Sequence, residues 1–346
     1  MLTRDFDYDL PPELIAQQPI EPRDASRLLV VHRDGGRLEH RRFGDLLDYM
    51  RAGDVLVANE TRVIPARLQA RKLPSGGRVE LLLLARRSPT VWESLVKGRR
   101  VAPGQRLALW RADGQGGAPV VEGTVQAISP AGGRIIAFER PIDDLLDALG
   151  DVPLPPYIHR QLDDAERYQT VYARERGSVA APTAGLHFTP ALLERLHQRG
   201  VIWTSVVLHI GLDTFRPVTE EQVEEHRIHT ENCRLSADCA AVINAAKAEG
   251  RRVIAVGTTA VRVLETAARG QAQGVAPWEG DTDLFIYPGY RFAVVDALIT
   301  NFHLPRSSLL MLVSAFAGRE LVLRAYQAAI AERYRFYSLG DSMLII

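Results

Sequence analysis

The sequence lacks the short motifs that mark several common enzyme classes. It has no Gly-x-Gly-x-x-Gly run, and no lysine directly follows a glycine, so a dinucleotide-binding turn and a phosphate-binding P-loop are not expected. The Gly-x-Ser-x-Gly elbow of serine hydrolases is also missing. Any chemistry must therefore come from other arrangements of residues.

Cysteine is scarce, which limits metal and redox chemistry. The chain has two cysteines, Cys233 and Cys239, too few for a disulfide framework, a four-cysteine zinc site or a thiolate-bound iron-sulfur cluster. We expect both to be reduced thiols in the core of a cytoplasmic protein. His226, His229 and Glu231 form a His-x-x-His-x-Glu pattern, which is not a usual zinc spacing. We therefore expect no metal.

Long hydrophobic runs and an excess of one charge are also missing. No apolar run approaches the ~20 residues that span a bilayer, and the first residues lack the apolar segment of a secretion signal. The 42 basic residues balance the 42 acidic ones, so the net charge does not indicate nucleic acid binding. A chain of 346 residues, 46% of them hydrophobic, is long enough for about two domains. We expect a cytoplasmic monomer that does not bind membranes.

The charges are unevenly distributed along the chain. Residues 60–106 hold eleven arginines and lysines against three glutamates, whereas residues 139–166 hold eight acidic residues and two arginines. In and after the basic stretch, strand-like segments such as 78–84 and 123–128 alternate with turns rich in glycine and proline. This pattern is typical of a small β-barrel or sandwich. Its basic residues either hold phosphates or lie spread over a solvated surface.

The remaining segments indicate a layered α/β domain. Ser236 begins a helical pattern that stops at Gly250, residues 252–256 form a buried strand pattern, and a turn at 257–259 leads into a helix over 260–268. Further helices are expected at 46–51, 191–199, 309–316 and 320–334, and strands at 54–58 and 201–209. The β-rich block interrupts this series. We therefore predict an α/β domain of residues 1–66 and 153–346 with an inserted β-barrel domain of residues 67–152.

One histidine lies in a turn-rich loop immediately before a predicted helix. His187 follows Pro182 and Gly185, and Thr189 with Pro190 is a helix start signal. Polar chemistry is thereby placed where a loop can meet a ligand. The alternative is that His187 fills space near the helix cap.

Three further runs place polar groups at the edge of an apolar segment. They are His209–Pro217, His226–Glu231 and Thr300–Pro305. Such runs are typical of a pocket lined by strand ends and loops.

These runs, together with residues 59–67 and 257–259, resemble the S-adenosylmethionine:tRNA ribosyltransferase-isomerase family of queuosine biosynthesis. The resemblance extends nearly end to end, from Asp5-Phe6-Asp7 to the terminal run at 337–343. Two departures are Glu60, where the family more often has aspartate, and Ile228, where methionine is usual. The family's architecture, an α/β domain with an inserted β-barrel, matches the predicted pattern.

The resemblance also implies a reaction. In the family, the ribosyl part of S-adenosylmethionine, a co-substrate rather than a bound prosthetic group, is moved onto 7-aminomethyl-7-deazaguanine at the tRNA wobble position. Adenine and methionine are released. The partners would be S-adenosylmethionine and tRNA carrying that base. The alternatives are an S-adenosylmethionine-dependent tRNA methyltransferase and a non-catalytic tRNA-binding protein.

Such a reaction needs a base beside the sulfonium, assistance to the leaving adenine and a neutral substrate amine. Histidine suits these steps because its pKa lies near the operating pH, and carboxylates can orient it or hold the amine. The candidate catalytic residues are His187, His229, His303, Asp213 and Glu231.

Other residues are candidates for binding. Thr258 and Thr259 either bind the methionine carboxylate at a helix start or simply cap the helix. The phenylalanine rings either attract the sulfonium or pack in the core. The candidate substrate-binding residues are Asn59, Arg62, Thr183, Gly185, Phe188, His209, Arg216, Gly257, Thr258, Thr259, Asn301 and Phe302. The candidate RNA-binding residues are Arg67, Arg71, Lys72, Arg99 and Arg100.

Overall fold

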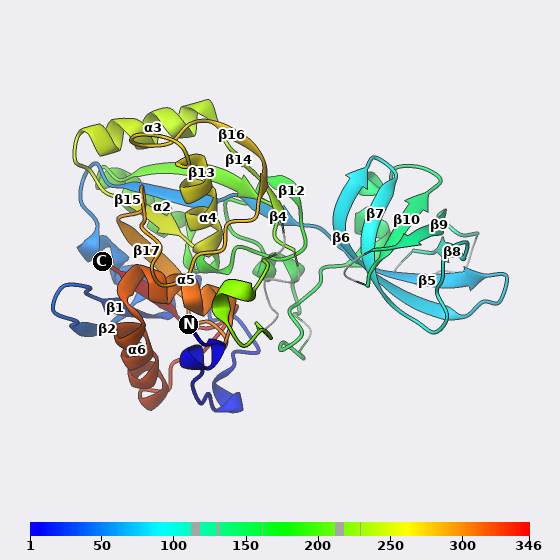
Figure 1. Cartoon of the computed structure of the whole chain (residues 1–346), viewed down its shortest axis with the longest axis horizontal. Coiled ribbons are helices and arrows are strands. Elements are labelled where there is room, and N and C mark those ends of the chain that lie inside the picture. The colour runs from blue at the N-terminus through cyan, green and yellow to red at the C-terminus, as the bar shows by residue number, and fades with distance from the viewer. Residues whose placement is uncertain (112–117, 130–131, 161, 212–217, 229) are drawn as a thin grey trace. The chain divides into compact units, whose positions relative to one another are not determined.

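The chain folds into two compact units, seen in the computed structural model of Figure 1. The structure describes all residues except 112–117, 130–131, 161, 212–217 and 229. The first unit comprises Met1–Arg62, Pro155–Glu175 and Ala181–Ile346, and the second comprises Val63–Leu154 and Arg176–Ala180. Two passages of the chain between the units lie on short paired strands, β4 (Thr61–Val63) and β12 (Glu175–Ser178), and the chain also changes unit after Leu154 and Ala180.

The first unit is built on a nine-stranded mixed sheet with the order β16-β14-β13-β3-β15-β17-β18-β1-β2. The central strands β13, β3, β15 and β17 are parallel neighbours, so their carboxyl ends meet at one edge. The strands are β1 (Arg27–Val31), β2 (Leu38–Arg42), β3 (Val55–Asn59), β13 (Ile202–Leu208), β14 (Glu231–Leu235), β15 (Val253–Val256), β16 (Trp278–Thr282), β17 (Ala297–Asn301) and β18 (Ser342–Ile345).

Helices cover this sheet, which confirms the predicted layered α/β fold (Figure 1). They are α2 (Pro190–Gln198), α3 (Ala237–Ala248), α4 (Thr258–Ala267), α5 (Ser308–Ala317) and α6 (Arg319–Ala331). The predicted start signals are present, because the hydroxyls of Thr189 and Ser236 accept hydrogen bonds from the backbone amides of the first turns of α2 and α3. Each helix in the described part of the chain is too short or too polar to cross a bilayer.

Two expected segments are 3-10 helices. The helix expected at 46–51 is η4 (Phe43–Tyr49), and the loop that carries His187 is η7 (Thr183–His187). The other 3-10 helices of this unit are η1 (Thr3–Phe6), η2 (Pro12–Leu14), η3 (Arg23–Ala25), η6 (Ala165–Tyr168) and η9 (Val223–Glu225).

The core on one face of the sheet lies under η4, η7 and α2. Leu56 of β3, Ile254 of β15 and Ile299 of β17 pack there against Phe43 and Phe188. Alternate residues of each strand point to the opposite face, and α3 and α4 pack against the same strands. Because η7 is part of this packing, the position of its last residue, His187, is fixed relative to the sheet.

The second unit is a closed antiparallel barrel, as predicted. Six strands follow in the order β5-β6-β7-β10-β9-β8, and β8 pairs back to β5. Closure leaves no free sheet edge among these six strands. The elements are β5 (Arg67–Leu73), β6 (Arg78–Ser88), β7 (Val91–Lys97), β8 (Arg106–Leu109), β9 (Val121–Ile128), β10 (Arg134–Phe138), η5 (Asp143–Leu145), α1 (Leu146–Leu149) and β11 (Gly150–Asp151).

Candidate active site

A small cavity lies where β15 and β17 end, and we call it the threonine cavity. Gly257 takes a φ of 88° between β15 and α4, a left-handed conformation that favours glycine, and the turn brings Thr258 and Thr259 to the cavity wall. In open α/β sheets, ligands bind outside the carboxyl ends of the strands. The cavity has a volume of about 50 Å³ and is lined by Ala181, Pro182, Thr183, Ala184, Ile210, Gly257, Thr258, Thr259, Thr300, Asn301 and Leu309.

A second cavity, which we call the His303 cavity, shares part of this wall. Thr183, Asn301 and Leu309 line both cavities. The backbone of His303 is held on both sides, because its amide donates to the Tyr326 hydroxyl at 2.9 Å and its carbonyl accepts from the Tyr8 hydroxyl. This cavity has a volume of about 40 Å³ and is lined by Tyr157, Thr183, Asn301, Phe302, His303, Leu304, Ser307, Leu309, Tyr337 and Ser338.

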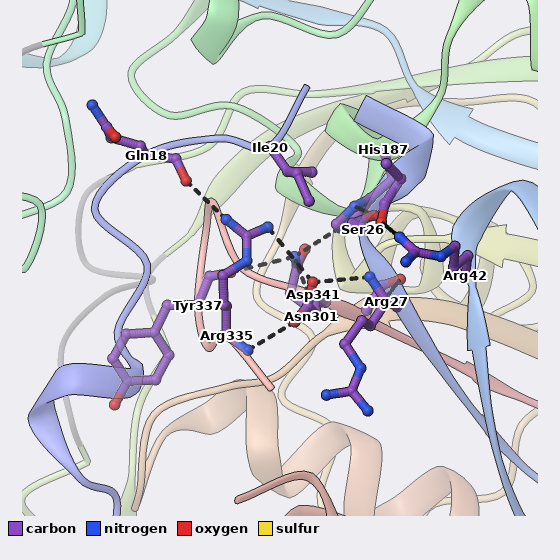
Figure 2. Close-up of polar contacts among 12 residues, drawn as sticks. Gln18, Ile20, Ser26, Arg27, Arg42, His187, Asn301, Arg335, Tyr337 and Asp341 are labelled. Atoms are coloured by element: carbon purple, nitrogen blue, oxygen red, sulfur yellow. Dashed lines mark hydrogen bonds and ion pairs between the residues drawn. The ribbon is translucent and has the colours of Figure 1, made fainter. Parts of the chain in front are cut away.

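His187 and Asn301 join these cavities to a third one, the His187 cavity. The side-chain amide of Asn301 donates to His187 Nε2 at 3.1 Å, and His187 Nδ1 lies 2.7 Å from the Ser26 hydroxyl. Figure 2 shows these side chains meeting beside Asp341. The cavity has a volume of about 20 Å³ and is lined by Pro19, Ile20, Arg23, Arg167, Leu186, His187, Ser338, Leu339 and Gly340.

Asp341 forms hydrogen bonds with two segments of backbone near Asn301 (Figure 2). Its carboxylate accepts from the backbone amides of Arg27 and Arg335, at 2.9 and 2.8 Å, and lies 3.5 Å from the Arg335 guanidinium. Tyr337, between them, has a φ of 70°, which is rare for a bulky residue and occurs where surrounding structure holds it. Its carbonyl faces the Asn301 amide at 3.3 Å.

Burial keeps both histidines of the site neutral. His187 and His303 are almost completely buried, and loss of solvation lowers the pKa of each to about 3. The charges of Arg335 and Arg23 lower the pKa of His187 further. Nε2 of His303 lies 2.9 Å from the Thr300 hydroxyl. In the described part of the structure, Nδ1 of His303 has no hydrogen-bond partner, whereas both ring nitrogens of His187 have one.

The barrel carries a cluster of unpaired cations at the β5–β6 hairpin and the turn after β7, which we call the basic pole. Arg71 and Arg78 lie directly opposite each other on β5 and β6, a like-charge pair that costs stability, and Lys72 donates to the Arg99 carbonyl at 3.1 Å. Among the described residues, no carboxylate lies within ion-pair distance of the members of the pole, although Lys97 is directly opposite Glu80 across β6 and β7. The members of the pole are Arg71, Lys72, Arg78, Lys97, Arg99 and Arg100.

Comparison with known proteins identifies the family. The model of the family described as "Queuosine biosynthesis protein" matches residues 3–345. The chain belongs to this family. It is 57% identical to an S-adenosylmethionine:tRNA ribosyltransferase-isomerase from Moorella thermoacetica over the full length of both chains, and 55% identical to one from Thermus thermophilus, covering 99% of this chain and 98% of that one.

A solved structure supports the same assignment. The crystal structure of S-adenosylmethionine tRNA ribosyltransferase from Thermotoga maritima is 41% identical, with a TM-score of 0.57, and the match covers 99% of this chain and 100% of that one. The resemblance noted in the sequence is thereby confirmed.

The fold brings one group of the predicted site residues together. Thr183, Asn301, Phe302 and His303 meet at the His303 cavity, and Gly257, Thr258 and Thr259 join Thr183 and Asn301 at the threonine cavity. His187 reaches this group through Asn301.

Three predicted binding residues of this queuosine family member have structural roles instead. Among the described residues, the buried amide of Asn59 bonds to backbone alone: it donates to the Leu208 carbonyl and accepts from two amides, and so joins the ends of β3 and β13. A Cβ on Gly185 would lie 1.9 Å from the Tyr172 hydroxyl, which requires glycine there for packing. Phe188 packs at the core against Phe43, Tyr172 and Trp203, which is the alternative given for its ring.

Other predicted residues lie apart from the cavities or are already paired. Glu231 forms a buried ion pair with Arg262 and accepts from the Gly211 amide at 2.9 Å. Arg62 pairs with Glu166, and Arg67 of β5 lies 3.8 Å from Glu80 rather than in the basic pole. His209 follows β13, and burial lowers its pKa. Asp213, Arg216 and His229 lie outside the described residues.

Several residues of the site were not predicted from the sequence. Ser26, Thr300 and Asp341 contact the predicted residues, and Arg78 and Lys97 extend the basic pole. Ser26 and Asp341 lie in segments that resemble the family at either end of the chain. Their distance from the histidine runs in the sequence gave no reason to group them with the site.

Proposed function

We propose that the protein is an S-adenosylmethionine:tRNA ribosyltransferase-isomerase. It transfers the ribosyl part of S-adenosylmethionine onto 7-aminomethyl-7-deazaguanine at the tRNA wobble position and isomerises it, giving epoxyqueuosine-tRNA and releasing adenine and methionine. The observation that carries the proposal is the full-length identity of 53–57% to several proteins of that name. The fold supplies a site for it at the carboxyl ends of parallel strands.

In this proposal, S-adenosylmethionine binds across the threonine and His303 cavities. The amides at the start of α4, with the hydroxyl of Thr259, suit the carboxylate of methionine, and that hydroxyl is buried without a partner among the described residues. Each cavity has room for only a few waters, at roughly 10–15 Å³ each. Binding therefore requires lining residues such as Leu309, which both cavities share, to move.

His303 is the described histidine best placed for a proton step. It lines a cavity, its backbone is held by two tyrosine hydroxyls, and Nδ1 faces no protein partner in the described part of the chain. Its neutral imidazole has a lone pair at Nδ1 for the proton beside the sulfonium. Because burial lowers its pKa to about 3, it is a weak base until the cavity opens for the substrate. Asp213 and His229 remain candidates for orienting the amine or sharing the proton.

The basic pole is proposed to hold the tRNA backbone. Its six cations are exposed or half-buried, and unpaired basic side chains gain most from phosphates because they release condensed counterions. Of the residues predicted for this task, Arg71, Lys72, Arg99 and Arg100 belong to the pole.

Product analysis tests the proposal. The protein is incubated with S-adenosylmethionine and tRNA carrying the aminomethyl-deazaguanine base, and the small molecules are separated by chromatography. Equal amounts of adenine and methionine are expected. Stoichiometric S-adenosylhomocysteine without adenine would instead establish methyl transfer, and tRNA binding with no product would establish a binding protein.

A further inference from the structure

We propose that His187 is a positioning residue: it holds the side-chain amide of Asn301 in one orientation, so that the amide oxygen accepts a hydrogen bond from an N–H group of the substrate. The inference rests on the proposed function for the identity of that substrate. It differs from a proton-transfer role for His187, which its place in the sequence first indicated.

The orientation of the Asn301 amide follows from its neighbours. Its Nδ2 lies 3.3 Å from the Tyr337 carbonyl and 3.4 Å from the Asp341 carbonyl, and its Oδ1 lies 3.1 Å from the Thr183 hydroxyl. Exchanging oxygen and nitrogen would set the amide oxygen against two carbonyl oxygens. The nitrogen must therefore face the carbonyls and His187.

This orientation fixes the tautomer of His187. Because the Asn301 nitrogen can only donate, Nε2 of His187 must accept, at 3.1 Å. The proton of a neutral ring is then on Nδ1, which donates to the Ser26 hydroxyl at 2.7 Å. Each residue in this series of hydrogen bonds donates to the next: Asn301 to His187, and His187 to Ser26.

The surroundings oppose any other state of the ring. His187 is stacked on Phe43, with ring centroids 5.0 Å apart, and the charges facing it are those of Arg23 and Arg335. A second proton would point at the Asn301 amide hydrogens and put a positive charge on a buried ring. Both ring nitrogens are already used, so His187 has no lone pair left for a substrate proton.

Within the described part of the chain, one lone pair on Asn301 Oδ1 has no hydrogen-bond partner. The Thr183 hydroxyl occupies the other, and both residues line the threonine and His303 cavities. An N–H donor fits this acceptor: either the exocyclic amine of adenine in S-adenosylmethionine or the amine of the modified base. Both amines would donate the same kind of hydrogen bond. They differ in which substrate, S-adenosylmethionine or tRNA, binds more weakly when the Asn301 oxygen is no longer held in place.

Two amide variants of His187 separate the roles. In H187Q the longer side chain can place a carbonyl near the position of Nε2, whereas in H187N the amide reaches only the position of Nδ1. We expect H187N to raise the KM of one substrate at least tenfold, and H187Q to recover most of that loss. A rise in the KM of S-adenosylmethionine identifies adenine as the donor, and a rise in that of tRNA identifies the modified base.

Other results would overturn the proposal. Equal losses of ~10² to 10⁴ in kcat for both variants would indicate proton transfer, and equal KM values with reduced thermal stability would indicate packing alone. Nitrogen-15 NMR of the imidazole rings tests the tautomer without any catalysis. The wild-type signal that disappears in H187Q belongs to His187, and it should show a proton on Nδ1 from pH 5.5 to 8. A proton on Nε2, or titration near pH 6.5, contradicts the assignment. Wild-type release of S-adenosylhomocysteine would refute the proposed function but leave this tautomer unaffected.

Discussion

The hydroxyl of Thr183 donates to the side-chain oxygen of Asn301 at 3.1 Å, across 118 residues of sequence. Thr183 begins η7 and Asn301 ends β17. The contact therefore joins the segment that carries His187 to the segment that carries His303, and it stands on the wall between two cavities. A change at this contact would therefore affect both cavities.

Removing His303 should impair chemistry more than binding. We expect His303→Ala to lower kcat by ~10² to 10⁴, the usual contribution of general acid-base catalysis, with little change in the KM of either substrate. Steady-state kinetics of adenine release measures this. His32→Ala is the matched control, because His32 pairs with Glu39 at the β1–β2 hairpin and should retain full turnover. Unchanged kcat in folded H303A would exclude His303 from the proton steps.

Thr259→Val should weaken S-adenosylmethionine binding without destabilising the fold. The buried hydroxyl has no partner among the described residues, so valine removes only a ligand contact, and a hydrogen bond to a charged group contributes about 1.5–3 kcal/mol. Calorimetry should show a dissociation constant roughly tenfold higher or more.

The control for this variant is Thr266→Val on the same helix. Thr266 shares a hydrogen bond of 2.6 Å with Thr282, so its loss should cost about 1 kcal/mol of unfolding free energy and leave ligand affinity unchanged. An identical affinity for T259V and wild type would remove Thr259 from the binding site.

Acid should destabilise the protein through its buried histidines. The folded pKa of His187 and of His303 is about 3, below the ordinary histidine value of 6.5, so between these values the unfolded chain binds more protons and stability falls as pH falls. From pH 7.5 to 5.5 each histidine should remove about 1 kcal/mol of unfolding free energy.

Denaturant titrations at the two pH values measure this loss, and H187Q or H303Q should each reduce it by about 1 kcal/mol. Each variant is compared with the wild type at both pH values. If H303Q shows the wild-type loss, His303 does not stay neutral in the folded protein.

The basic pole should set the salt dependence of tRNA binding. The logarithm of affinity falls with the logarithm of salt by roughly 0.7–0.9 per phosphate contacted, so replacing Arg99 and Arg100 with alanine should flatten the slope by about one unit for each arginine that touches a phosphate. Filter binding at several salt concentrations measures the slope.

Arg86 and Arg87 provide the comparison within the barrel, because they pair with Asp143 and Glu93. Their double alanine variant should keep the wild-type slope. S-adenosylmethionine affinity should be unchanged in both variants. Equal slopes for R99A/R100A and wild type would place the tRNA contacts elsewhere.

Local patterns in the sequence determined the elements and the fold class. Hydroxyl caps at Thr189 and Ser236, the glycine turn at 257, and the alternation of strands with turns in the barrel act over a few residues, so they can be read along the chain. The α/β layers and the barrel could be predicted from these local patterns. The 3-10 character of η4 and η7 could not be predicted in this way, because short helices depend on what they pack against.

Only the tertiary structure decided which polar residues share a site. Asn59, Asn301 and Glu231 all stand at the ends of strands, and the sequence ranks them alike. The amide of Asn59 is used up by backbone, the carboxylate of Glu231 is paired with Arg262, and Asn301 alone of the three lines a cavity among the described residues. Partners brought from more than a hundred residues away determine these outcomes for Asn59 and Asn301. Hydrogen bonding and burial at a polar group depend on such partners, which neither periodicity nor local spacing contains.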